Sequence, residues 1–169
     1  MFPGKKLLFM GGEIGQRPEW DANGELDWWV LNEGPFHRGT QRFVEDLNKL
    51  YQREPALWQR DYDYDGFFWV DCSDSENSVL SFVRQDAERR SQLLVVLNLT
   101  PVVRHAYRVG LPRGGDWSEV LNSDAEAYGG SNQGNLGGVA SEEYQVQGQP
   151  FSAAVTLPPL AVIVLKADS

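Results

Sequence analysis

The change of pattern at Pro55 constrains the fold of this chain more than any other feature of its sequence. Before Pro55 lie one short apolar run, a long loop and one amphipathic segment. Beyond Pro55, short extended runs alternate with turn residues, and no second amphipathic helix is indicated. This change predicts two unlike parts, of which only the second has enough extended runs to close a core of its own.

Seven extended runs in the second part predict an all-β domain. They are Gly66–Asp71, Ser78–Gln85, Gln92–Asn98, His105–Val109, Trp117–Asn122, Phe151–Leu157 and Ala161–Lys166. Leu93–Leu97 and Ala161–Leu165 are apolar without interruption, so we expect them in the middle of the sheets. The alternating run Phe151–Leu157 is expected nearer an edge. Short strands in this number favour two antiparallel sheets packed as a sandwich.

The first part has the pattern of a single β-loop-α unit. Lys6 to Met10 form an apolar run that ends at paired glycines, which predicts a strand buried in a parallel sheet. A loop from Gly11 to Phe36 follows, and helical spacing predicts a helix from about Arg38 to Gln52, ended by Pro55. One such unit cannot form a domain, because a (β/α)8 barrel takes about 250 residues. We therefore expect the rest of a barrel upstream of Met1.

The expected division places residues 1–57 in the final strand, loop and helix of that barrel. Residues 58–169 then form the C-terminal sandwich domain. The 169-residue chain has 24 acidic and 15 basic residues and a formal charge of −9, which would repel a nucleic-acid backbone. The apolar run before Gly11 is too short for a membrane or export segment, so no membrane partner is expected. Cys72 is the only cysteine, which suits the cytoplasm.

Motifs that would bind metals or cofactors are incomplete. Asp61–Gly66 matches the opening of a calcium-binding loop, but its twelfth position is Cys72 in place of a bidentate glutamate. We expect a solvated turn there. Gly129–Gly138 lacks the residues of a phosphate loop and predicts a flexible surface loop. Neither His37 nor His105 has a second ligand at metal-binding spacing, so we expect no metal and no cofactor.

The loop from Glu13 to Trp29 is the candidate binding site. It follows the predicted strand at its carboxyl end, which is the active-site face of a barrel. Indole rings cover the apolar faces of sugars, while carboxylates and guanidinium groups bind hydroxyls. The candidate substrate-binding residues are Glu13, Arg17, Glu19 and Trp20. The alternative is that the tryptophans fill a core, which applies most to Trp28 and Trp29. No two acidic residues of the chain are assigned as a catalytic pair.

Several stretches resemble bacterial 1,4-α-glucan (glycogen) branching enzymes of the α-amylase superfamily. KKLLFMGGEIGQRPEW followed by LDWWVL resembles their eighth barrel strand and the loop after it. The resemblance continues through HRGTQRFVEDLNKLYQREPAL, LLVVLNLTPVVRHAYRVGLP and the closing LPPLAVIVLK, and so covers nearly the whole chain. Its most specific part is EVLNSDAEAYGGSNQGNLGG, from Glu119 to Gly138. Ile14 and Trp29 depart from the family pattern, where an aromatic residue and a histidine are usual.

The resemblance implies a mainly β fold, with the last β-loop-α unit of a (β/α)8 barrel followed by an antiparallel β-sandwich. It also implies a reaction in glycogen biosynthesis: an α-1,4 glucan segment is cleaved, held covalently and transferred to a 6-hydroxyl to form an α-1,6 branch. The family's nucleophile, acid/base and third carboxylate lie before the position that matches Met1. The resemblance therefore implies an inactive isolated chain with no catalytic residue. Its implied partners are an α-glucan (glycogen or amylose) and the upstream barrel of the same polypeptide.

Two alternatives remain open. The sandwich can act as a non-catalytic glucan-binding module if it presents an exposed platform of aromatic side chains. The chain can also belong to another hydrolase of the superfamily, such as an amylase or a debranching enzyme. The segment AYGGSNQGN, which begins at Ala127, argues against the second alternative.

Overall fold

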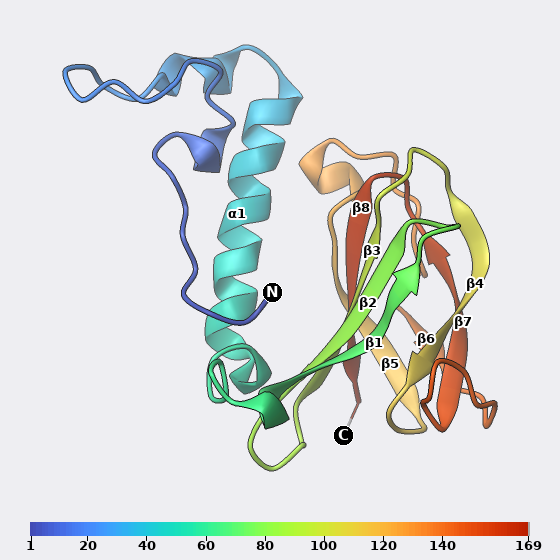
Figure 1. The fold of residues 1–169 in the computed structure, drawn as a ribbon. Coiled ribbons are helices and arrows are strands. Elements are labelled where there is room, and N and C mark those ends of the chain that lie inside the picture. Colours follow the sequence, from blue (N-terminus) through green and yellow to red (C-terminus); the bar gives the residue numbers. More distant parts are fainter. Residues whose placement is uncertain (169) are drawn as a thin grey trace.

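The computed structural model describes residues 1–168 as a long helix packed against one face of a β-sandwich (Figure 1). Helix α1 spans Pro35–Arg53. The strands are β1 Phe67–Asp74, β2 Val79–Gln85, β3 Gln92–Asn98, β4 Arg104–Leu111, β5 Asp116–Asn122, β6 Gly138–Ala140, β7 Phe151–Leu157 and β8 Ala161–Ala167. Short 3-10 helices are η1 Gly12–Ile14, η2 Trp28–Asn32, η3 Pro55–Leu57, η4 Tyr64–Gly66 and η5 Glu126–Tyr128.

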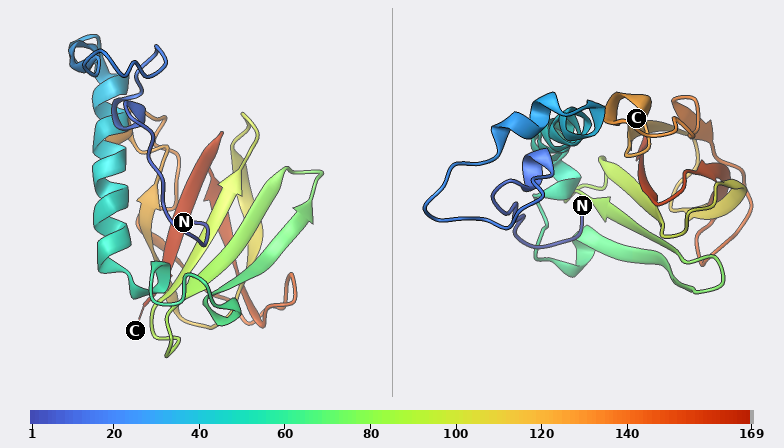
Figure 2. Two further views of the ribbon diagram at one scale, coloured as in Figure 1. Left: turned by 60° about the vertical axis from the view of Figure 1, so that its left-hand side comes forward. Right: turned by 90° about the horizontal axis from the view of Figure 1, so that it is seen from above.

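The strands form two antiparallel sheets, as the sequence predicts. The larger sheet has the order β1-β2-β3-β8-β5-β6, and the smaller sheet consists of β4 and β7. Figure 2 shows α1 on the outer side of the larger sheet, away from β4 and β7. Each of the seven predicted runs overlaps an observed strand. The additional strand, β6, has three residues within a glycine-rich stretch, where no apolar alternation signals a strand.

The larger sheet separates two apolar cores. The core between the sheets contains Val70, Val79, Val83, Leu94, Val96, Val109, Leu111, Trp117, Ala153, Val155, Leu157, Ile163, Leu165 and Ala167. The core between the larger sheet and α1 contains Leu50, Ala56, Leu57, Phe82, Leu93, Val95, Leu121 and Val164. Successive residues of β3 and β8 therefore point into different cores. This explains their uninterrupted apolar runs and confirms their central position, because β3 and β8 are neighbours in the sheet.

Helix α1 begins three residues earlier than the sequence predicts. Pro35 lies in its first turn, where proline is favoured because the missing N–H has no partner within the helix. Leu47 and Leu50 recur at helical spacing and pack against the larger sheet. The helix ends at Arg53, and Pro55 begins the short helix η3 that leads into the sandwich.

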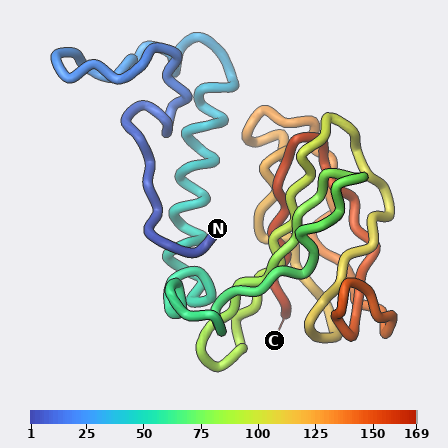
Figure 3. The backbone as a smooth tube through the Cα atoms, in the orientation of Figure 1, coloured from blue at the N-terminus to red at the C-terminus, as the bar shows by residue number. Residues whose placement is uncertain are grey.

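The predicted strand from Lys6 to Met10 is not formed. These residues belong to no strand. Figure 3 shows the segment running beside α1. Leu7 is 89% exposed. The physical reason is that a parallel strand satisfies its N–H and C=O groups only on adjacent strands, and residues 1–168 supply none at this position.

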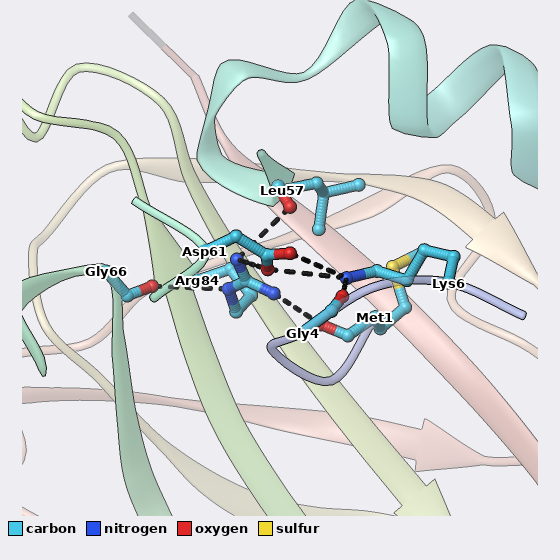
Figure 4. A network of polar contacts seen from close by, with 7 residues as sticks. All are labelled: Met1, Gly4, Lys6, Leu57, Asp61, Gly66 and Arg84. Atoms are coloured by element: carbon cyan, nitrogen blue, oxygen red, sulfur yellow. Dashed lines mark hydrogen bonds and ion pairs between the residues drawn. The ribbon is translucent and has the colours of Figure 1, made fainter. Parts of the chain in front are cut away.

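A buried arginine of β2 connects the N-terminal segment to the sandwich (Figure 4). Arg84 is 0% exposed. Its guanidinium donates hydrogen bonds to the carbonyls of Met1 (2.8 Å), Leu57 (3.2 Å) and Gly66 (3.2 Å) and to Asp61 Oδ1 (2.9 Å). Lys6 Nζ lies 3.2 Å from Asp61 Oδ2. The arginine therefore holds carbonyl groups that are far apart in the sequence.

The expectation of a solvated turn at Asp61–Gly66 is wrong for its first and last residues, because Asp61 and Gly66 are buried. Asp61 is buried, because Arg84 and Lys6 balance its charge. Burial by itself would raise the pKa of Asp61, but the hydrogen bonds from Arg84 and Lys6 outweigh burial and lower that pKa. The later residues Tyr64 and Asp65 are exposed, as expected of a turn.

A second buried carboxylate lies where α1 ends. Glu54 is 1% exposed, and Lys166 Nζ of β8 lies 2.9 Å from its Oε2. Arg53 Nε donates to Glu54 Oε1 at 3.0 Å, and Ser91 Oγ donates to Oε2 at 3.3 Å. Burial would raise the pKa of Glu54, but the hydrogen bonds from Lys166 and Arg53 outweigh it and lower that pKa. The end of α1 is thereby fixed to the centre of the larger sheet.

Candidate functional site

The base of the candidate loop is attached to α1 through η1. Gly11 precedes η1 with φ of 84°, a left-handed conformation that glycine adopts without strain. Ile14 of η1 is buried, and its carbonyl accepts a hydrogen bond from His37 Nδ1 at 2.8 Å. Because His37 belongs to the first turns of α1, the turn before the loop is held to the helix. The loop then extends away from α1 (Figure 1).

The structure brings two of the four predicted site residues together. Glu19 and Trp20 line a surface hollow of about 410 Å³ with Phe9, Met10, Gly11, Gly12, Gln16 and Pro18. Trp20 is 45% exposed and packs edge-to-face on Phe9, with ring centroids 6.0 Å apart. Much of the indole is therefore open to solvent beside a carboxylate. This is an arrangement that suits contact with a sugar ring.

The other two predicted residues, Glu13 and Arg17, do not line this hollow. Glu13 lies in η1 and is half-buried. Arg17 Nη2 is 3.4 Å from Glu33 Oε2 in an exposed ion pair. Both lie in the same loop region, but the structure does not gather all four side chains around one point.

Phe9 is the site residue that the sequence analysis missed. The apolar pattern places it inside a buried strand, yet its ring is exposed and faces Trp20. Its position just before Gly11 and Gly12 was the available signal, because a residue at the end of a strand faces the loop that follows. Trp28 and Trp29 are also exposed, so among residues 1–168 they do not fill a core.

One group of aromatic side chains on the sandwich stays partly open to solvent. Trp69 of β1 is 40% exposed, and its ring packs edge-to-face on Phe67 and Phe82 with centroids 5.2 Å and 5.7 Å away. Trp117 is buried in the core between the sheets, and Tyr107 packs against that core. Tyr128 faces α1, where its ring contacts Phe43. The exposed rings of Tyr64 and Tyr144 come from separate turns, one in η4 and one after β6. Packing therefore explains three of the aromatics considered for a binding platform, whereas Trp58, Trp69 and Tyr144 are exposed. An independent binding module stays an alternative.

The segment Glu119–Gly138 contains the predicted surface loop Gly129–Gly138, whose residues are exposed or half-buried. Hydrogen bonds attach the segment to the sandwich. Asp124 accepts from Ser131 N at 2.9 Å, Ser131 Oγ at 2.6 Å and Gln133 N at 3.1 Å. Asn135 exchanges two hydrogen bonds with the backbone of Thr156 on β7. The polar side chains therefore satisfy backbone groups of their own loop and of β7.

This segment also forms the contact between the sandwich and the upper half of α1. Tyr128 OH donates to Asp46 Oδ2 at 2.9 Å. Burial, together with this hydrogen bond, raises the pKa of Tyr128 to about 12. A Cβ on Gly39 would come within 2.2 Å of the Tyr128 carbonyl oxygen. The helix can therefore approach the loop this closely only with glycine at that position.

The part of the chain described by the structure contains no group of three or more His, Cys, Asp or Glu side chains placed to hold a metal ion. Within the same residues, no helix has the length and apolar character needed to cross a membrane.

Comparison with known proteins gives the chain its relatives. It is 55% identical over 164 residues to the 1,4-alpha-glucan branching enzyme of Aquifex aeolicus, covering 97% of this chain and 26% of that protein. The corresponding enzyme of Cereibacter sphaeroides is 55% identical over 95% of this chain and 22% of its own length. That of Synechococcus sp. WH7803 is 50% identical, with coverage of 98% and 22%. The chain thus spans about a quarter of the length of these curated relatives.

A solved structure and a family model agree on the fold. A crystal structure of a mutant of MUTB, from crystals soaked with trehalulose, superposes with a TM-score of 0.51. It covers 84% of this chain and 20% of that one at 19% identity, a likeness that concerns the fold alone. The family model described as "Alpha amylase, C-terminal all-beta domain" matches residues 69–168, which hold β2 to β8 and most of β1. The chain therefore belongs to the family of α-amylase C-terminal all-beta domains.

Proposed function

We propose that this chain is the C-terminal part of a bacterial 1,4-α-glucan branching enzyme. Such an enzyme transfers α-1,4 glucan segments to form α-1,6 branches in glycogen. The observation that carries the proposal is the 55% identity to the Aquifex aeolicus enzyme, because it extends over 97% of this chain. The similarity therefore includes the loop and α1 as well as the sandwich.

Within that enzyme, residues 1–57 complete the catalytic barrel and residues 58–169 form the sandwich domain. Two observations support this division. Residues 1–57 supply α1 and the candidate loop but no strand of either sheet. The apolar side chains of Leu7 and Leu8 are exposed in the chain as it stands, which is how a barrel strand without its neighbours would lie.

The hollow around Trp20 contacts the α-glucan, glycogen or amylose. The indole stacks on a sugar ring, and Glu19 accepts hydrogen bonds from its hydroxyls. Glu13 and Arg17 extend the contact surface from the same loop. The catalytic carboxylates belong to the upstream barrel of the same polypeptide, which acts in the cytoplasm without a cofactor.

A chimaera tests this function directly. The chain would replace the aligned quarter of the Aquifex aeolicus enzyme, and branching of amylose would be followed by the fall in iodine absorbance. We expect the chimaera to form branches and the isolated chain to give no signal above a blank, because covalent glycosyl transfer needs carboxylates that this chain does not supply. A folded chimaera that releases reducing ends without branching would favour a hydrolase instead.

A further inference from the structure

We propose that Gln16 is a positioning residue that closes the neck of the loop from Arg17 to Asp27 and so sets the place of Trp20. The sugar-binding consequence rests on the proposed function. The closure itself does not, and the two are tested separately below.

The carboxamide of Gln16 bonds to both ends of the loop. Its Oε1 accepts a hydrogen bond from the backbone N–H of Asp27 at 3.0 Å. Its Nε2 donates to the carbonyl of Pro18 at 3.3 Å. A single side chain therefore joins the backbone at the start of the loop to the backbone at its end. We call this pair of positions, Pro18 and Asp27, the neck of the loop. Closing a loop restricts its conformations, so a bond at the neck limits the positions of every residue between.

Gln16 is itself held by the turn below it. Its backbone N–H donates to the Gly11 carbonyl at 2.9 Å. A Cβ on Gly11 would lie 2.8 Å from Gln16 Cβ, so only glycine leaves room for the glutamine. The same turn is bound to α1 through His37 and the carbonyl of Ile14. A continuous series of contacts thus runs from the helix through η1 and Gln16 to the far end of the loop.

The two hydrogen bonds of the Gln16 side chain, here called the clamp, lie beside the candidate site. Gln16 lines the same hollow as Phe9, Glu19 and Trp20. Trp20 follows Pro18 by two residues and packs on Phe9. Opening the neck would release Trp20 from that contact. Neither apolar core would change, because Gln16 and the loop belong to neither.

Hydrogen exchange at the Asp27 amide tests the closure in the 169-residue chain. We expect Gln16→Ala to speed exchange at this amide about fivefold, the equivalent of one net hydrogen bond. Gln16→Glu keeps the acceptor, so the Asp27 amide should remain slow. The matched control is Gln59→Ala, because Gln59 also accepts a backbone N–H, that of Ala87, on a surface remote from the loop. Unchanged exchange at Asp27 in Gln16→Ala would overturn the proposal.

Kinetics of the chimaera test the consequence for the glucan. Trp20→Ala should raise the KM for amylose about tenfold, and Gln16→Ala about fivefold, with melting temperatures close to that of the parent. The double variant should be no worse than Trp20→Ala alone, because both changes remove one contact. Additive effects, or a lower melting temperature with unchanged KM, would overturn the positioning role. An unchanged KM in Trp20→Ala would refute the glucan contact and leave the exchange result to decide on the clamp.

Discussion

Both faces of the larger sheet are apolar, but different parts of the chain cover them. Strands β4 and β7 cover the inner face, and they lie within the same sandwich. Helix α1 covers the outer face, and it comes from the segment before Pro55. An uninterrupted apolar run therefore indicates that both faces of a strand are buried, but it does not indicate which element covers each face. The sandwich also shares part of its core with the first 57 residues.

We call the contact of α1 and η3 with the larger sheet the outer contact, and the contact between the two sheets the inner contact. Buried ion pairs distinguish the outer contact. Glu54 and Asp61 are buried beside α1 and η3, each paired with a cation from the sheet, Lys166 and Arg84 respectively. Buried pairs of this kind contribute little net stability, but losing one partner is costly because the other charge stays buried. The outer contact should therefore tolerate fewer substitutions than its apolar area indicates.

Removing Arg84 should break the outer contact most severely. Arg84→Ala leaves three carbonyls without this donor and leaves the buried Asp61 with Lys6 alone, and we expect the free energy of unfolding to fall by about 3–5 kcal/mol. Urea unfolding followed by circular dichroism measures this loss. The control is Arg90→Ala, whose exposed ion pair with Glu88 should contribute less than about 1 kcal/mol. Equal effects of the two variants would contradict the role assigned to Arg84.

Neighbouring leucines of β3 can separate the two faces. Leu93 points to α1 and Leu94 to the inner core, and both are fully buried. Each change to alanine should cost about 2–5 kcal/mol in the whole chain. In a chain of residues 58–169, which we expect to fold alone, Leu94→Ala should keep its cost, while Leu93→Ala should lose most of it because that face is then in water. An unchanged cost for Leu93→Ala would show that α1 does not bury this side chain.

Acid should weaken the contact between α1 and the larger sheet. The folded-state pKa of Glu54 lies below its unfolded value, so its stabilising contribution is present above about pH 4.3 and is lost as pH falls through the folded pKa. Glu54→Gln should be less stable than the parent at pH 7, and the difference should shrink in acid. Urea unfolding between pH 7 and pH 3 measures it. Glu45→Gln, which alters an exposed pair with Lys49, should show little difference at either end.

The smallest expected effect concerns the hydroxyl of Tyr128. Tyr128→Phe removes the hydrogen bond to Asp46 and should lower the free energy of unfolding by about 0.5–1.5 kcal/mol. Because the pKa of Tyr128 is raised to about 12, this contribution is present below about pH 10 and is lost as pH rises through 12. Tyr144→Phe, at an exposed ring, is the matched control. If Tyr144→Phe lowered the free energy of unfolding by as much, the hydrogen bond between Tyr128 and Asp46 would not be the cause of the loss.

The sequence predicts the parts of the fold that depend on periodicity. The strands and central positions of β3 and β8 follow from their apolar runs, and α1 follows from its spacing and from Pro55. Contacts between distant residues are not predictable in this way: Arg84 and the carbonyl of Met1 are 83 positions apart, and no local pattern marks them. The prediction of a strand from Lys6 to Met10 was wrong for a related reason, because a strand forms only beside neighbouring strands.

The candidate site was predictable in composition but not in arrangement. The abundance of tryptophan and carboxylates after a strand-like run identified the loop, and Glu19 and Trp20 do share a hollow. Hydrogen bonds to backbone groups decide which side chains meet there. The bond from Asp27 N to Gln16 and that from His37 to Ile14 leave no mark in residue spacing. Phe9 shows the same limit, because its apolar neighbours in the sequence predict a buried strand although its ring is exposed beside Trp20.

Helix α1 also connects the sandwich rigidly to the loop. Its 19 residues make it about 28 Å long. Glu54 fixes one end to the sheet, and the Gly39–Tyr128 contact holds it nearer the loop. A tilt of about 5° at the Glu54 end would move the other end by about 2 Å. Side chains of the sandwich that contact this helix therefore also determine where the loop lies, and substitutions at that contact should move the loop before they alter the fold.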